Sequence, residues 1–153
     1  MNARTITARA LATGIIATTA AFGMAGTADA VSQRGCRATP LTPTFAGINP
    51  AGKKVLKYTV RVTCAANRTV VLQQQVKERD TFLNPDDLVR SRTLIRTFVV
   101  AGSKTVSLYQ ATPNTEPGNE EMFHQVRIRV SIGGGPFGAY SAWDKSAVVS
   151  VNA

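Results

Sequence analysis

The sequence has few of the residues on which most catalytic and metal sites depend. It contains two cysteines and one histidine in 153 residues. Two cysteines are too few for a four-cysteine zinc site or a disulfide-dense mini-scaffold. A serine-histidine-acid triad would have to use His124, and no Gly-x-Ser-x-Gly motif accompanies it. These absences favour a protein that is not an enzyme and that holds no metal or cofactor.

The charged residues are also too sparse for a disordered chain. They make up 18% of the sequence, against 44% apolar residues. The length suits one domain with a single hydrophobic core.

The first thirty residues predict a secretory signal peptide. Arg4 and Arg9 precede an uncharged stretch of small and apolar residues from 10 to 27, and Ala28-Asp29-Ala30 has the pattern that signal peptidase recognises. A membrane anchor is the alternative, but the most apolar part is shorter than the roughly 20 residues that span a bilayer. We expect cleavage after Ala30, a single domain over residues 31–153, and an extracellular location.

Export predicts a disulfide between Cys36 and Cys64. Secreted proteins fold in oxidising compartments, where an even pair of cysteines usually bridges. The two cysteines are 64 − 36 = 28 residues apart. Closing a loop of this size stabilises a fold by roughly 3–4 kcal/mol in the chain-entropy model.

The remaining sequence has the two-residue period of β-strands. Tyr58, Val60, Val62 and Cys64 alternate with polar residues, and a longer alternation runs over residues 122–132. We expect strands at 38–46, 54–64, 70–77, 93–100, 105–111, 122–132 and 146–151, with a helical turn or tight loop at 84–88. About seven strands predict an antiparallel β-sandwich of immunoglobulin-like layout. A small closed barrel is the alternative. The resemblance is architectural and implies no function.

The candidate catalytic groups have simple structural readings. The alternation places His124 on the apolar face near the start of its strand, so we expect a histidine at the edge of the core with one nitrogen hydrogen-bonded. A glycosidase pair could be hidden among the carboxylates, because sequence spacing does not fix spatial distance. Asn67-Arg68-Thr69 matches a glycosylation acceptor, which matters only if the protein passes through an endoplasmic reticulum.

The excess of positive charge is the first candidate for function. The formal net charge is +9, and removal of residues 1–30 leaves (18 − 2) − (9 − 1) = +8. Arg90, Arg92 and Arg96 share one parity, and Arg127 and Arg129 form a second outward-facing pair. Such stripes can hold anionic polymers. A solvated face that keeps sheet edges from pairing is the alternative.

The glycine-rich segment 133–143 is the second candidate. Phe137, Tyr140 and Trp143 follow three consecutive glycines at a spacing of three. Tyrosine and tryptophan are favoured contact residues, and the end loops of a sandwich often carry recognition. Alternatively, these rings fold back over the open end of the core. We therefore predict a secreted non-catalytic domain that binds a polyanionic or cell-envelope ligand through the basic face or this loop. A small hydrolase and a purely structural surface protein are the alternatives.

Overall fold

The computed structural model describes residues 30–79, 85–113 and 118–152, and within these ranges all regular structure is β. The predicted leader lies outside the described residues except for Ala30. The strands of the described residues are β1 (Val31–Gln33), β2 (Cys36–Pro40), β3 (Thr44–Ile48), β4 (Lys54–Cys64), β5 (Arg68–Glu78), β6 (Asp87–Phe98), β7 (Gly102–Ala111), β8 (Asn119–Ile132), β9 (Asp144–Lys145) and β10 (Val149–Asn152).

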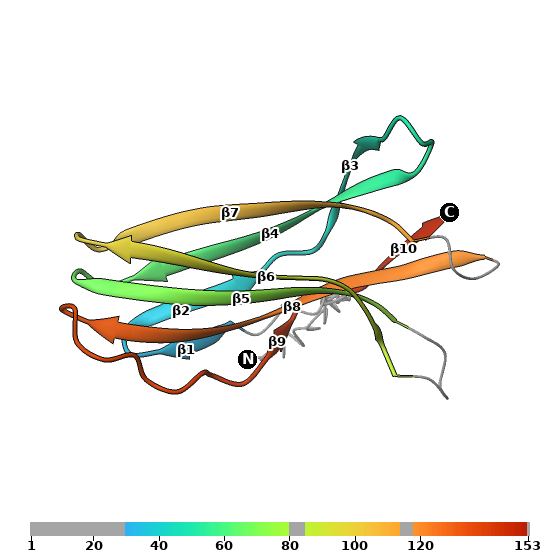
Figure 1. The fold of residues 1–153 in the computed structure, drawn as a ribbon. Helices are drawn as coiled ribbons and strands as arrows, with labels where there is room; N and C mark the ends of the chain where they lie inside the picture. The colour runs from blue at the N-terminus through green and yellow to red at the C-terminus, as the bar shows by residue number, and fades with distance from the viewer. Residues whose placement is uncertain (1–29, 80–84, 114–117, 153) are drawn as a thin grey trace, which may run out of the picture.

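Two antiparallel sheets pack face to face as a sandwich, which confirms the predicted fold class (Figure 1). In the first sheet, β2 and β3 pair with the two halves of β4 on one side, and β7 pairs with β4 on the other. In the second, β9 and β10 share one side of β8, and the order continues through β5 to β6. Short β1 extends the first sheet beyond β2. Among the described strands, β3, β6 and β7 each pair with one neighbour only, so the two sheets do not close into a barrel.

The alternating apolar residues form the core between the sheets, as expected. On β4 the buried positions are Leu56, Tyr58, Val60, Val62 and Cys64. They face β5 and β8, whose buried apolar side chains include Leu72, Val126 and Ile128. Each such side chain contributes about 1.5–3 kcal/mol by leaving water. The two-residue period therefore places the core on the correct face of both long strands.

The start of β6 differs from the prediction. The strand begins at Asp87, six residues before the expected start, and ends at Phe98, so Val99 and Val100 belong to the following turn. Asp87 and Leu88 are strand residues and not part of a helical turn, while Asn84 lies outside the described residues. The first half of β6 carries charged and polar residues because it is an edge strand, and apolar periodicity does not mark it.

The disulfide joins Cys36 and Cys64, as predicted. The two residues are directly opposite each other in the β2–β4 ladder, with their Cα atoms 4.1 Å apart. The bridge therefore joins β2 to β4 within one sheet. It does not cross the core between the sheets as the usual immunoglobulin bridge does.

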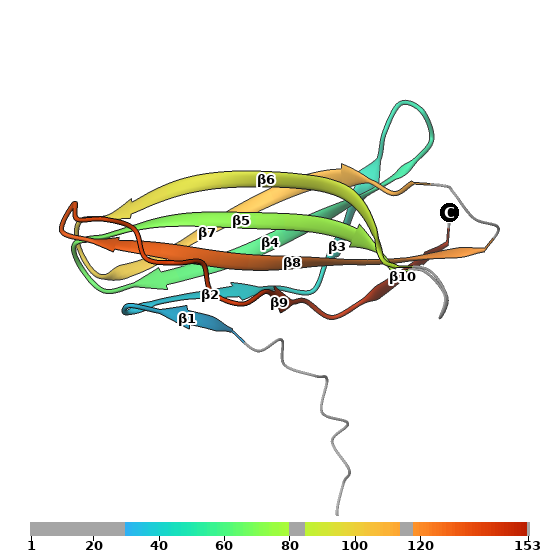
Figure 2. The ribbon, with the colours of Figure 1, turned by 60° about the horizontal axis from the view of Figure 1, so that its bottom comes forward.

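Four turns gather at one end of the sandwich, which we call the turn end (Figures 1 and 2). It comprises Arg34–Gly35, residues 65–68, residues 99–101 and residues 132–137. Backbone hydrogen bonds join the turns. Ala65 N donates to Gly35 O, Asn67 N to Val99 O, and Gly133 N to Asn67 O, at 2.9, 3.3 and 3.0 Å. Arg34 and Asn67 have positive φ angles of 46° and 54°, which lets the chain reverse tightly there. The turn end is therefore one continuous surface.

Candidate binding surfaces

A chain of hydrogen bonds crosses the core and includes the only histidine of the sequence. The Arg92 guanidinium donates twice to Gln74 Oε1, at 2.8 and 2.6 Å. Gln74 Nε2 lies 2.7 Å from His124 Nδ1, and His124 Nε2 lies 2.7 Å from the Leu41 carbonyl oxygen. The chain thus connects β6, β5 and β8 of one sheet with the segment after β2 in the other.

The chain fixes the protonation of His124. The oxygen of the Gln74 amide accepts from Arg92, so its nitrogen faces the imidazole and donates to Nδ1. Nδ1 is then an acceptor, and the ring proton is on Nε2, which donates to Leu41. Burial, opposed by the Leu41 hydrogen bond and assisted by nearby Arg92, lowers the pKa of His124 to about 4.

His124 is therefore a structural residue at the centre of the sandwich. It has no exposed surface, and both ring nitrogens are hydrogen-bonded, whereas the sequence predicted an edge position with one satisfied nitrogen. The prediction missed Gln74 and Leu41 because neither is near His124 in sequence. Tyr58 packs its ring edge against the imidazole, with the ring centroids 5.5 Å apart.

The arginines of β6 line the seam between the edge strands of the two sheets. Arg92 Nη1 donates to the Ser107 carbonyl of β7 at 2.9 Å, and Arg90 Nη1 reaches the Gln110 side chain at 3.2 Å. In the opposite direction, Lys104 Nζ of β7 donates to the Thr97 carbonyl of β6 at 2.7 Å. Burial, with the charges of Arg90 and Arg96, lowers the pKa of Arg92. These cations occupy carbonyls that an added strand would otherwise use.

Arg96 forms its hydrogen bond within its own strand and not across the seam. Its Nη1 donates to the carbonyl of the adjacent Ile95 at 2.8 Å, and the side chain is half-buried. Arg90, Arg92 and Arg96 do share one side of β6, as their parity predicted. That side is the inner face of the sheet, because Leu94 and Phe98 on the same parity pack against the core.

The basic pair of β8 and the aromatic loop form a single cluster. The Arg127 guanidinium lies 4.5 Å from the ring centroids of both Tyr140 and Trp143. The Arg129 guanidinium lies 5.2 Å from the centroid of Phe137 and 5.0 Å from that of Tyr140. These distances are typical of cation–π contacts. The five side chains form what we call the arginine–aromatic ladder.

The ladder lies on the outer face of the second sheet. Segment 133–143 turns back along the side of β8 opposite β5, where Gly138 N donates to Val130 O and Ser141 N to Ile128 O, at 3.1 and 2.8 Å. Arg127 and Arg129 are half-buried beneath it. The rings cover the arginines and do not fold over the open end of the core, because residues on that parity of β8 point away from the core.

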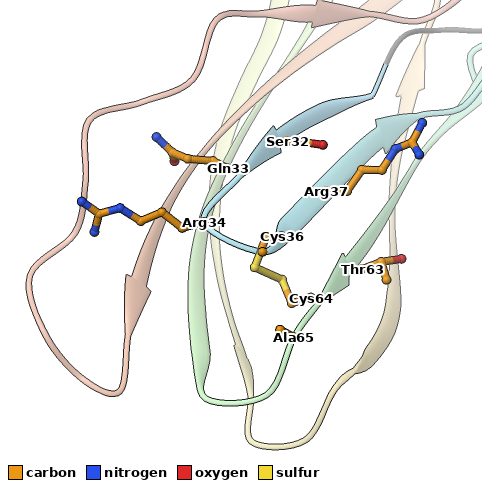
Figure 3. Close-up of a pocket in the computed structure, with 9 residues that line it drawn as sticks. Ser32, Gln33, Arg34, Cys36, Arg37, Thr63, Cys64 and Ala65 are labelled. Atoms are coloured by element: carbon orange, nitrogen blue, oxygen red, sulfur yellow. A yellow bond between two sulfur atoms is a disulfide. The ribbon is translucent and has the colours of Figure 1, made fainter.

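A shallow hollow lies beside the disulfide at the turn end (Figure 3). Its walls come from the β1–β2 turn and the end of β4, including Ser32, Thr63 and Ala65. The two arginines that line it, Arg34 and Arg37, lie on opposite sides of the disulfide and point away from each other (Figure 3). The hollow therefore contributes to a basic surface, but its charges do not converge on one point.

Two buried carboxylates lie at the opposite end of the sandwich. Glu78 of β5 and Glu120 of β8 are both on inner-face positions of neighbouring strands. Neither lines the hollows beside the disulfide, beside Phe45 or beside Phe123. Within the described ranges no group of three or more histidine, cysteine or carboxylate side chains is placed to hold a metal ion.

Net positive charge is concentrated in the half of the sandwich that bears the turn end, because the acids of the described residues lie in the other half. Segments 30–41, 59–73, 93–107 and 127–143 contain no aspartate or glutamate. Strand pairing brings these four segments together, with Arg61 opposite Thr105, Thr69 opposite Thr97 and Gln73 opposite Arg127. This acid-free half carries Arg34, Arg37, Arg61, Arg68, Arg96, Lys104, Arg127 and Arg129.

The acids of the described residues lie in the other half, from Asp144 opposite Val126 near the middle of β8 to Glu78 and Glu120 at the far end. Both ion pairs found among those residues are there: Arg79 with Glu121 at 3.8 Å and Lys145 with Asp86 at 3.7 Å. The charge of the protein is thus strongly polarised along the strands. Sequence reasoning found the excess charge and its stripes, but missed this segregation because it depends on which strand ends meet.

No family model matches this chain, and a search of the curated proteins returns no match. Over the parts of the chain that the structure covers, no helix has the length and apolar character needed to cross a membrane. The arguments about function therefore rest on the surfaces described above.

Proposed function

We propose that the protein is a secreted, non-catalytic binding domain that holds an anionic ligand of the cell envelope through its acid-free half. The observation that carries this proposal is the collection of eight cations without an acid in that half. A cluster of one sign creates a potential that draws anionic ligands to the surface. The disulfide between Cys36 and Cys64 supports an oxidising, extracellular location.

The acid-free half supports the proposal better than the β6 stripe alone. Arg92 is occupied by Gln74 and the Ser107 carbonyl, whereas Arg37 and Arg61 are exposed on the outer face of the first sheet. Ligand contacts by Arg37 and Arg61 would not require the seam to open.

Binding of heparin to the exported protein at about 50 and 200 mM salt tests the proposal. Counterion release makes affinity for a polyanion fall steeply over this range. The fall increases with the number of contacts between protein cations and anionic groups of the polymer. Arg37→Glu combined with Arg61→Glu should weaken binding at least tenfold. The matched control is Lys53→Glu combined with Lys57→Glu, which changes net charge equally in the other half and should weaken binding much less.

The same experiment separates charge placement from net charge. Equal losses in the two double variants would show that only net charge matters and would refute the acid-free half as the site. Mass spectrometry of the exported protein should find Val31 at the N-terminus. A chain that retains residues 1–30 would contradict the proposed secretion by cleavage.

A further inference from the structure

The turns at the tip of the acid-free half carry exposed apolar side chains. Val99 and Val100 are 73% and 75% exposed, and Ile132, at the end of β8 on the other side of β5 from β6, is 47% exposed. Turns at the end of a sandwich usually carry Gly, Asn, Asp or Ser, because such residues suit the backbone and water. Two adjacent valines at a turn tip contribute nothing to the core and keep apolar surface in contact with water.

These apolar residues form one patch with the neighbouring turns. The backbone bonds from Asn67 N to Val99 O and from Gly133 N to Asn67 O hold the three turns side by side. Ala65 and Ala66 add small exposed side chains to the same surface. The patch is therefore a property of the fold and not of one loop.

Five cations lie in the turns of the apolar tip or in the strand residues that follow or precede them. Arg34 and Arg68 are in the turns themselves, and Arg68 holds its turn by donating to the Arg34 carbonyl at 2.9 Å. Arg37, Arg96 and Lys104 are two to three residues further along their strands. At about 3.3 Å per residue, the backbone positions of these three cations lie roughly 7–10 Å behind the tip.

We infer that the turn end docks onto the surface of an anionic lipid bilayer. Peripheral proteins bury apolar groups about 5–10 Å into the boundary between headgroups and acyl chains, and basic residues near the surface are attracted to anionic headgroups. The turn end has both features at the matching separation, and no acid in the acid-free half opposes the approach. A soluble polyanion would explain the cations but not the exposed valines.

This inference rests on the proposed function, because it names the ligand of the same acid-free half. The test uses sedimentation of the exported protein with vesicles of phosphatidylglycerol and phosphatidylcholine in equal parts, and with pure phosphatidylcholine vesicles. We expect binding to the anionic vesicles only. Val99→Ser with Val100→Ser should lower the partition coefficient about tenfold or more while leaving heparin binding unchanged.

The matched control is Phe45→Ser with Ile48→Ser. These side chains are similarly exposed, at 62% and 65%, on β3. Strand β3 pairs with the first residues of β4, at the end of the sandwich away from the turns. The control should bind anionic vesicles like the unmodified protein. Arg37→Glu should weaken binding to both vesicles and heparin, because it removes charge that either ligand would contact.

Each other outcome overturns the inference in a distinct way. Heparin binding without vesicle binding leaves the proposed function intact and refutes the membrane as its ligand, whereas failure of both refutes the two together. If Val99→Ser with Val100→Ser leaves vesicle binding unchanged while Arg37→Glu weakens it, the protein adsorbs by charge alone. If the protein self-associates and Val99→Ser with Val100→Ser abolishes this, the apolar patch binds a second copy of the chain and not a membrane.

Discussion

Acidification should destabilise this protein through His124 before most carboxylates titrate. The folded protein holds the imidazole neutral, with a pKa of about 4, whereas an unfolded chain has a histidine pKa near 6.5. Between these values the unfolded state binds the proton and the folded state does not. Stability is therefore full above pH 6.5 and is lost as the pH falls toward 4.

The magnitude follows from the difference in pKa. Proton linkage over that interval gives a loss of about 3 kcal/mol between pH 7 and pH 4, and about 2 kcal/mol of it is lost by pH 5. The hydrogen-bond chain explains why the protein resists protonation. A proton on Nδ1 would meet the donating amide of Gln74, and turning that amide would remove the acceptor of Arg92. A typical domain has only ~5–15 kcal/mol of total stability, so the effect is large enough to measure.

Urea unfolding at pH 7, 6, 5 and 4 measures this loss. His124→Gln provides the reference, because it titrates nowhere in the range and retains all carboxylates. Subtracting the pH-dependent change in unfolding free energy of the variant from that of the unmodified protein gives the contribution of the imidazole. An equal pH dependence in both proteins would refute the argument. So would an NMR titration of the single native imidazole with a midpoint near 6.5.

Three further predictions concern the disulfide, the seam and the ladder. Thiol titration of native protein should find no free cysteine, and Cys36→Ser with Cys64→Ser should lower the free energy of unfolding by roughly 3–4 kcal/mol without changing the fold; two reactive thiols would contradict the bridge. Arg92→Met should cost about 2–3 kcal/mol in urea unfolding, because it leaves buried Gln74 without its donor, and clearly more than Arg96→Met; equal costs would mean that the buried chain adds nothing. Tyr140→Ala should cost about 1–2 kcal/mol and speed hydrogen exchange at the Gly138 and Ser141 amides, since it removes two cation–π contacts; unchanged exchange, like that expected for the exposed control Tyr109→Ala, would show that the ladder does not hold the loop.

The sequence predicted those parts of the fold in which local pattern and burial agree. The alternation on β4 and β8 identified the core face, and export together with the cysteine count identified the bridge. The direction of the β6 arginines was missed, although a signal was present. Leu94 and Phe98 have the same parity as Arg92 and Arg96, and their burial places the arginines on the inner face.

Contacts that join distant segments could not be predicted from local pattern. The spacing of Phe137, Tyr140 and Trp143 does not reveal which face of the sheet they cover, because the glycines before them allow several directions. In the fold the loop follows the side of β8 opposite β5, where Arg127 and Arg129 offer complementary partners. We predicted two separate surfaces from these residues, and the structure joins them in one. Reversal of both arginines would therefore disturb the loop as well as the charge.

The charge polarity of the molecule comes from where the fold places the acids. Beyond residue 30, the acids of the sequence occur only within residues 78–87 and 116–121 and at position 144. Glu78 ends β5, Asp87 begins β6, and Glu120 and Glu121 lie at the start of β8, so antiparallel pairing brings these acids to the end of the sandwich away from the turns. Acids from separate parts of the sequence are therefore collected toward one end, whereas cations remain in both halves. Arg37→Glu and Lys53→Glu alter net charge equally, but only the first reduces the contrast between the two ends. Comparing the two variants thus measures charge placement, which composition alone cannot predict.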